Sequence, residues 1–134
     1  MQDYEVLKTY RDAVRELSLL QRQMDMCLSA GTPREAQATS GGRGTNHRQA
    51  AQLQHYDGLA DIFARKQAAL NEVAVRFEQI MEEVHSPRLR YILRSYYALG
   101  MTDEAIAREL GMTCRRINEL RNQFLRSLEM AEAA

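Results

Sequence analysis

The chain has 134 residues, which is enough for one ordinary domain or two small ones. Hydrophobic residues make up 45% of it, while tryptophan is absent and glycine and proline are few, a composition that favours a helical protein. Its 18 basic and 18 acidic residues balance, so net charge does not indicate a polyanionic partner, and no apolar run is long enough to span a membrane.

Residues 3–29 have the apolar spacing of one long helix, about 40 Å in length by rise per residue. The apolar positions follow alternating steps of three and four residues, with Gln21 as a polar break: Leu7, Tyr10, Val14, Leu17, Met24 and Leu28. This heptad-like stripe predicts packing against another helix.

Residues 31–48 are rich in glycine, threonine and serine and show no apolar period, so we predict a flexible loop. Its three arginines are Arg34, Arg43 and Arg48. They allow two interpretations: a plain connector, or a flexible arm that contacts phosphates.

A second long helix is predicted for residues 49–84. Its main stripe is Leu53, Tyr56, Ala60, Phe63, Leu70, Ala74, Phe77, Met81 and Val84, and a second flank adds Ile62, Ala69, Val73 and Ile80. We expect the first helix to fold back on the main stripe, which makes residues 1–84 an antiparallel helical hairpin. The C-terminal domain or a second subunit would cover the second flank. Gly58 predicts a slight bend or close packing, because glycine costs about 1 kcal/mol relative to alanine in a helix.

Three shorter helices follow, and serine or threonine N-caps mark where they begin. The caps are Ser86, which precedes Pro87, and then Thr102 and Thr113. Gly100 and Gly111 mark the ends of the first two helices. The last helix is predicted to run to about Met130, beyond which the tail should fray.

Residues 102–122 have the spacing of a helix-turn-helix. Ala107 falls where two helices cross closely, Gly111 where the turn needs a positive φ, and Ile117 where the second helix returns to the core. The remaining predicted core positions are Ile106, Leu110, Met112 and Leu120. The second helix would present Thr113, Cys114, Arg115, Arg116, Asn118, Glu119, Arg121 and Asn122 outward, as a groove-reading helix does. The predicted fold is therefore all-α, with the hairpin at 1–84 and a helix-turn-helix domain at 85–130.

The positive charge is concentrated in the same region. Residues 86–128 contain eight arginines and four acidic residues, whereas residues 1–84 contain ten basic and 12 acidic residues. Arginine makes bidentate contacts with phosphates and guanine edges, so we expect double-stranded DNA as a partner.

Residues 73–128 resemble region 4 of the bacterial sigma-70 family, which reads the −35 promoter element. The motifs that carry the resemblance are Ser86-Pro87-Arg88, Thr102-x-Glu-x-Ile, Thr113-x-x-Arg-Ile and Leu125-Arg126-x-Leu128. The whole layout is similar to small phage and prophage proteins, and phage late-gene transcription activators are similar in size and arrangement. The resemblance implies that the positions facing DNA are Thr113, Cys114, Arg115, Arg116, Asn118 and Glu119. Cys114 and Asn118 depart from the charged residue and the arginine usual there, and the length leaves no room for the other sigma regions.

The predicted DNA-binding residues are Thr113, Arg115, Arg116, Asn118, Glu119, Arg121 and Arg88. Arg115 and Arg116 lie in the first turn and are the expected base readers, while Asn118 has the side chain that pairs with adenine. Glu119 is expected to pair with Arg115 four residues earlier, or to accept from a cytosine.

The other predicted contacts are with the DNA backbone. Arg121 is expected to meet phosphate or solvent, and Arg88 to position a phosphate. Arg90 and Arg94, an i, i+4 pair, favour either DNA or a protein acid opposite them.

The favoured function is a sequence-specific, DNA-binding transcription regulator of phage origin, whose hairpin forms a homodimer or meets RNA polymerase. One alternative is a DNA-recognition subunit of phage packaging, like a small terminase subunit. Another is a protein that acts on polymerase or a sigma factor without binding DNA.

Several classes of function lack support in the sequence. No glycine loop has the phosphate-binding pattern, so we expect no enzyme and no cofactor. No metal site is expected, because His47, His55 and His85 lack ligand spacing. Two cysteines and an acidic start without signal-peptide features favour a cytoplasmic, membrane-free protein.

Overall fold

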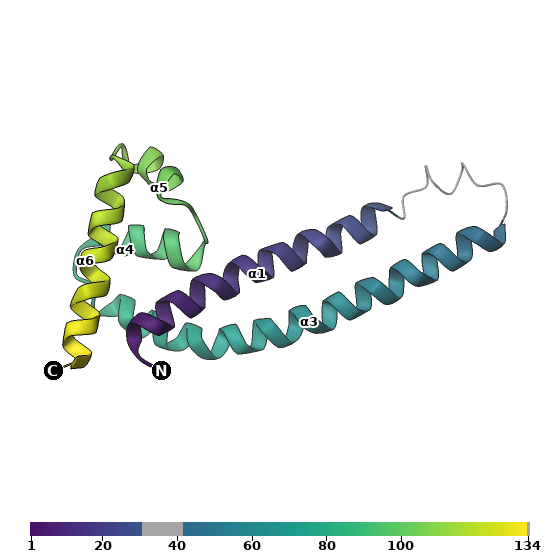
Figure 1. Ribbon diagram of the computed structural model, residues 1–134, viewed down its shortest axis with the longest axis horizontal. Helices are drawn as coiled ribbons and strands as arrows, with labels where there is room; N and C mark the ends of the chain where they lie inside the picture. The colour runs from purple at the N-terminus through teal and green to yellow at the C-terminus, as the bar shows by residue number, and fades with distance from the viewer. Residues whose placement is uncertain (31–41, 134) are drawn as a thin grey trace. The chain divides into compact units, whose positions relative to one another are not determined.

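The computed structural model describes residues 1–30 and 42–133, with side chains described for 1–29 and 48–133. This described part is helical and contains no strand, which confirms the predicted all-α class (Figure 1). The elements are α1 (Asp3–Ala30), α3 (Gly42–Glu82), α4 (Pro87–Leu93), the π-helical turn η1 (Arg94–Ala98), α5 (Asp103–Leu110) and α6 (Cys114–Ala133). In the same part of the chain, no helix has both the length and the apolar character needed to cross a membrane.

Two predicted helix boundaries are wrong. Helix α3 begins at Gly42 rather than Gln49, so residues 42–48 are helical and not loop. Extending an existing helix gains one hydrogen bond per residue, which offsets the poor helix propensity of this stretch. Helix α6 continues to Ala133 instead of fraying after Met130, and Glu132 accepts a hydrogen bond from the Asp3 backbone N–H. Arg34 and the side chain of Arg43, two members of the possible phosphate-binding arm, lie outside the described residues.

The chain forms two compact units, residues 1–15 with 69–134 and residues 16–68. The expected boundary at residue 84 therefore lies inside the first unit. The first turns of α1 and the last turns of α3 belong with the C-terminal helices.

In the unit of residues 16–68, the two helical segments run antiparallel. Lys66 Nζ lies 2.7 Å from Glu16 Oε1 near one end, and Cys27 lines a pocket with Tyr56 near the other. Leu20, Met24 and Leu59 form the buried core between them. The predicted stripe ends earlier than expected on both helices, since Leu28 and Leu53 are 57% and 59% exposed.

Gly58 lies on α3 in this unit. A Cβ added at Gly58 would meet no atom within 4 Å, so the predicted close packing is wrong.

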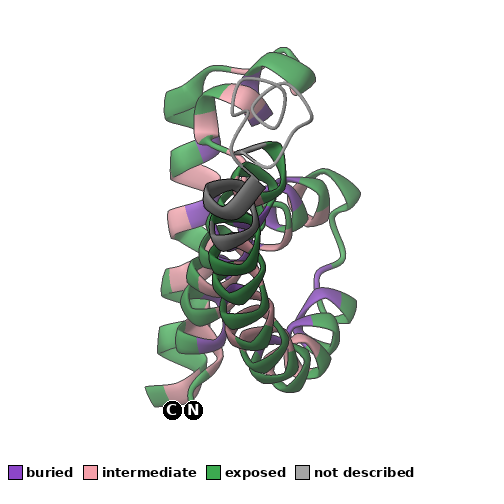
Figure 2. Ribbon diagram, turned by 90° about the vertical axis from the view of Figure 1, so that its right-hand side faces the viewer, coloured by how far each residue is buried: buried purple, intermediate pink, exposed green. Residues whose placement is uncertain are grey.

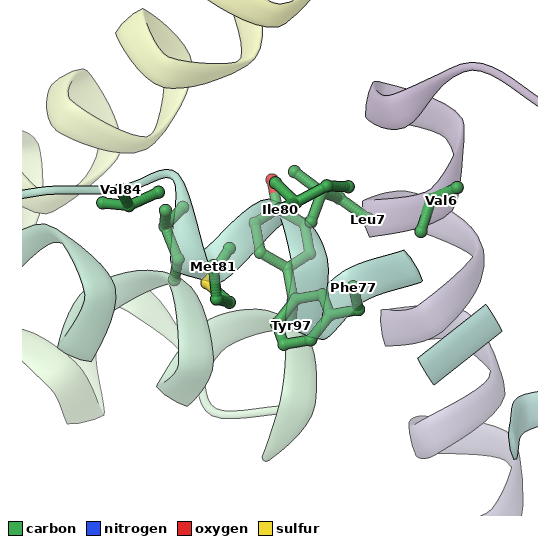
Figure 3. Close-up of a cluster of buried hydrophobic side chains, with 8 residues drawn as sticks. Val6, Leu7, Phe77, Ile80, Met81, Val84 and Tyr97 are labelled. Carbon is green, nitrogen blue, oxygen red and sulfur yellow. The ribbon is translucent and has the colours of Figure 1, made fainter. Parts of the chain in front are cut away.

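The main core of the other unit joins α1, α3, α4 and η1 (Figure 3). Its buried members are Val6, Leu7, Phe77, Ile80, Met81, Val84, Leu93 and Tyr97. Tyr10 stacks on Phe77 with 4.5 Å between ring centroids. Ile80, from the second flank of the predicted helix, packs in this cluster with Leu93 and Tyr97, so the C-terminal helices cover this part of the flank. Each such side chain contributes about 1.5–3 kcal/mol when fully buried.

A smaller core holds α4, α5 and α6 together, with Ile92, Ile106, Ala107 and Ile117 buried. Leu110, Met112 and Leu120 pack against it, as the sequence predicts. Buried and exposed positions are interspersed along α6 in Figure 2, the pattern of an amphipathic helix.

All three predicted N-caps are confirmed. The hydroxyl oxygens of Ser86, Thr102 and Thr113 accept from backbone N–H groups three residues later, at 3.1–3.2 Å. Gly111 ends α5 with φ +64°, a left-handed conformation that glycine adopts without strain. The start of α6 is therefore fixed by local interactions.

Candidate nucleic-acid interface

The first turn of α6 is exposed, and local hydrogen bonds fix both the turn that precedes it and its N-cap. The Met112 backbone N–H donates to the Ala107 carbonyl at 3.0 Å, and Thr113 Oγ1 accepts from the Arg116 N–H at 3.1 Å. Ile117 is fully buried and anchors the same turn to the core. The exposed residues of this turn include Thr113, Cys114, Arg115, Arg116 and Asn118, as predicted.

Glu119 holds both arginines of this turn. Arg115 Nε lies 3.1 Å from Glu119 Oε1, as the i, i+4 spacing predicts, and Arg116 Nη1 lies 3.5 Å from Oε2. The Arg115 side chain is nevertheless 90% exposed. Exposed pairs of this kind are worth only about 0.3–0.5 kcal/mol, so either arginine can exchange Glu119 for another anion at little cost.

Arg121 does not face outward, and this prediction is wrong. Its side chain is only 9% exposed, and it donates to Asp103 Oδ2 at 2.9 Å and to Oδ1 at 3.3 Å. Burial alone would lower the pKa of Arg121, but the hydrogen bond and charge of Asp103 outweigh burial and raise it. Arg121 follows Ile117 by one helical turn and precedes Leu125 by one, so it lies on the core side of α6.

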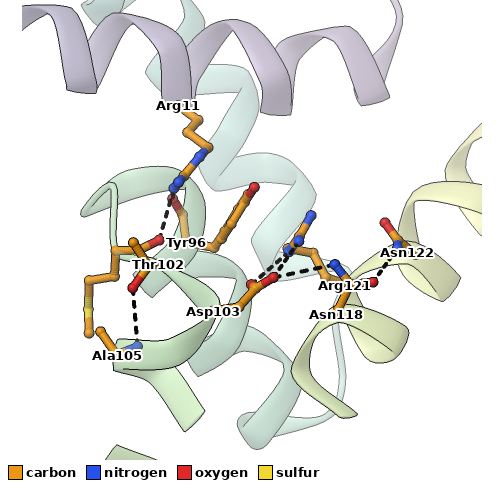
Figure 4. A network of polar contacts seen from close by, with 9 residues as sticks. Arg11, Tyr96, Thr102, Asp103, Ala105, Asn118, Arg121 and Asn122 are labelled. Carbon is orange, nitrogen blue, oxygen red and sulfur yellow. Dashed lines mark hydrogen bonds and ion pairs between the residues drawn. The ribbon is translucent and has the colours of Figure 1, made fainter. Parts of the chain in front are cut away.

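Asn118 is held in one orientation by its neighbours (Figure 4). Its Nδ2 donates to Asp103 Oδ2 at 3.3 Å, and its Oδ1 accepts from Asn122 Nδ2 at 2.9 Å. An asparagine amide has two N–H donors and two acceptor lone pairs, so one of each remains. A bidentate contact with adenine requires one donor and one acceptor, the number of free groups that the Asn118 amide keeps.

Arg94 has a protein acid opposite it, one of the two partners that the Arg90–Arg94 spacing favours. Its guanidinium donates to both Glu78 oxygens at 2.9 and 2.8 Å. The hydrogen bond from Arg94 lowers the pKa of Glu78, more than burial raises it. The Arg94 guanidinium is therefore engaged in an ion pair with Glu78 on α3.

Arg88 is exposed at the start of α4, away from the first turn of α6. Its neighbour Leu89 packs on the same cluster as Phe124 and Leu128, which lie about 14–20 Å further along α6 than Arg115 by helical rise. The structure thus does not bring Arg88 and Arg115 together, and a phosphate contact by Arg88 stays a prediction.

Half of the arginines in residues 86–128 have no ion-pair partner among the described residues. They are Arg88, Arg90, Arg108 and Arg126. Arg115 and Arg116 share one carboxylate, so the first turn of α6 keeps a net positive charge.

Two residues belong to the site although no motif in the sequence connects them to it. From the sequence, Asp103 is favourable to the helix dipole and Tyr96 is an apolar position, and neither property predicts a contact with α6. Both contact Arg121, Asp103 through its carboxylate and Tyr96 through its ring, whose centroid is 3.7 Å from the guanidinium carbon. The opposite charges of Asp103 and Arg121 are the available signal, but their separation along the chain gives no local spacing to recognise.

No protein-family model, no curated protein and no solved structure matches this chain. Function is therefore inferred from the geometry of the chain's own residues. Within the described part of the chain, no group of three histidine, cysteine, aspartate or glutamate residues is placed to hold a metal ion.

Proposed function

We propose that this protein is a sequence-specific, double-stranded DNA-binding transcription regulator of the phage type, with residues 85–130 acting as a sigma-region-4-like helix-turn-helix. One observation carries the proposal: the first turn of α6 presents Arg115 and Arg116 outward from a turn that Gly111 and Thr113 fix. In the helix-turn-helix plan, residues at the start of the second helix reach base edges in the major groove.

The proposed contacts divide into base reading and backbone positioning. Arg115 and Arg116 read base edges, where each bidentate contact contributes about 1–3 kcal/mol of discrimination. Thr113 and the unpaired arginines contact phosphates, which give affinity and salt dependence without sequence information. Glu119 exchanges its arginine partners for a cytosine amino group when the arginines engage DNA.

Residues 1–84, as a helical hairpin, are proposed to form a homodimer or to contact RNA polymerase in the cytoplasm. Exposed apolar side chains support this role: Leu19, Met26, Leu28 and Leu53. Light scattering tests the dimer, which fails if the protein is a monomer at high micromolar concentration. A ring-shaped oligomer would instead favour a packaging subunit.

The test of DNA reading is fluorescence anisotropy of the full chain on duplexes selected from a random pool, repeated over a salt series. We expect steep salt dependence and a clear preference for the selected duplexes. Arg115→Ala/Arg116→Ala should remove most of the preference, because both side chains read base edges, and should change the salt slope less than loss of phosphate contacts would.

The matched control is Arg22→Ala/Arg65→Ala, which removes two exposed arginines from the unit of residues 16–68. It should keep both the preference and the slope. Absence of binding by the wild-type chain at low salt would reject the proposal and favour a protein partner.

A further inference from the structure

Helix α1 contributes a buried arginine to the C-terminal helices. Arg11 is 9% exposed, and its Nη1 donates to the Tyr96 carbonyl and, at 3.0 Å, to the Met101 carbonyl (Figure 4). No carboxylate pairs with it among the described residues. Burial lowers the pKa of Arg11, yet arginine keeps its charge in proteins, so the two carbonyls must satisfy this cation.

These carbonyls flank a turn that has an unusual backbone. In η1 the Leu99 N–H donates to the Arg94 carbonyl, five residues back, and the Met101 N–H donates to the Ser95 carbonyl. The chain then reverses at Gly100, whose φ is +70°. Helix ends leave carbonyls without helical donors. Arg11 supplies donors on both sides of the turn that leads into α5.

Arg11 also holds the Tyr96 ring. Its guanidinium carbon lies 3.6 Å from the ring centroid, and that of Arg121 lies 3.7 Å from the same centroid. Two guanidinium groups cannot occupy one face of a ring at these distances, so the ring lies between them. Cation–π attraction therefore fixes Tyr96 against both arginines.

The contacts continue from Arg121 to the exposed face of α6. Arg121 binds Asp103, and the same Asp103 oxygen accepts from Asn118, whose other amide atom accepts from Asn122. A chain of direct contacts thus runs from α1 to the Asn118 amide.

We propose that Arg11 is a positioning residue that orients the Asn118 amide for base reading. It acts through Tyr96, Arg121 and Asp103. This inference rests on the proposed function and extends it, because it makes the first turns of α1 part of the unit that reads sequence.

The test is Arg11→Met in the full chain, which keeps the length of the side chain and removes the guanidinium. We expect the preference for a selected duplex over a scrambled one to fall about tenfold, the lower part of the range for one bidentate base contact. The salt slope should not change, because Arg11 is buried and contacts no phosphate. A slope that falls by about one with the preference intact would make Arg11 a phosphate contact and overturn the proposal.

Two further variants make the test specific. Arg22→Met, an exposed arginine on the same helix, should leave preference and slope unchanged. Arg11→Met combined with Asn118→Ala should lose no more preference than Asn118→Ala alone, because both changes remove the same base contact. Losses that add would overturn the proposal.

A measurement without DNA tests the positioning role of Arg11 independently of the proposed function. The side-chain amide NMR resonances of Asn118 and Asn122 should shift in Arg11→Met and stay in place in Arg22→Met, and unshifted resonances would refute the positioning role. If the wild-type chain prefers no duplex, the proposed function fails and reading by Asn118 fails with it. If Arg11→Met does not fold, Arg11→Lys keeps the charge with a single-point donor and should show a smaller loss of preference.

Discussion

Replacing Arg121 with methionine separates a structural arginine from a DNA-contacting one on the same helix. The variant keeps most of the side-chain volume but removes two hydrogen bonds to Asp103 and the contact with the Tyr96 ring. It also leaves the Asp103 carboxylate, whose side chain is 17% exposed, with Asn118 as its remaining side-chain donor among the described residues.

The expected loss follows from these contacts. Removing one partner of a buried pair costs about 3–5 kcal/mol. Asp103 keeps some exposure and one donor, so we expect a decrease of about 2–3 kcal/mol in the free energy of unfolding. For a unit of this size, that change lowers the melting temperature by roughly 10 °C or more.

The matched variant is Arg115→Met, the same substitution at a side chain that is almost fully exposed. Its effect on stability should be within about 0.5 kcal/mol, while its effect on DNA affinity should be large. Urea and thermal unfolding followed by circular dichroism, with anisotropy on the same samples, measure both quantities. If Arg121→Met unfolds like wild type and loses DNA affinity as Arg115→Met does, the burial of Arg121 is refuted.

Three further changes have defined expectations. Gly58→Ala should raise the free energy of unfolding by about 1 kcal/mol, because the new methyl group enters open space within a helix. Gly111→Ala should lower the free energy of unfolding by about 1–2 kcal/mol, because the φ of this residue is positive. Equal effects of the two variants in urea unfolding would contradict both expectations. Glu119→Gln removes the carboxylate that pairs with both arginines of the first turn. The variant should bind scrambled duplex severalfold more tightly at low salt, with a steeper salt slope. Unchanged anisotropy curves would show that Glu119 does not restrain Arg115 and Arg116. Ser86→Ala removes the hydroxyl that accepts from the Leu89 N–H and should cost about 1 kcal/mol in thermal unfolding, while Ser86→Asp, which can also cap, should restore most of it.

The parts of the fold that could be predicted are those set by local chemistry. Ser86, Thr102 and Thr113 begin helices because each hydroxyl satisfies a backbone donor three residues away, and that relation is visible in the sequence. The turn at Gly111 and the buried Ile117 follow from spacing in the same way.

The parts that escaped prediction depend on partners distant in the sequence. The charge of Arg121 predicts the outer face of α6, although its spacing from Ile117 places it on the core side; only the fold shows that Asp103 makes such a position tolerable. Arg11 similarly interrupts an apolar face, and its acceptors are backbone carbonyls, which have no sequence signature. The π-helical turn from Arg94 to Ala98 also has no residue pattern that marks it.

The composition of the first compact unit has a consequence for how the protein is made. Residues 1–15 must wait for residues 69–134 before they can be buried, and Asp3 meets Glu132 near the opposite end of the chain. Residues 16–68, in contrast, are contiguous and can pair as soon as they leave the ribosome, because translation is slow relative to helix pairing. The apolar residues at the start of α1 stay exposed to solvent throughout this interval.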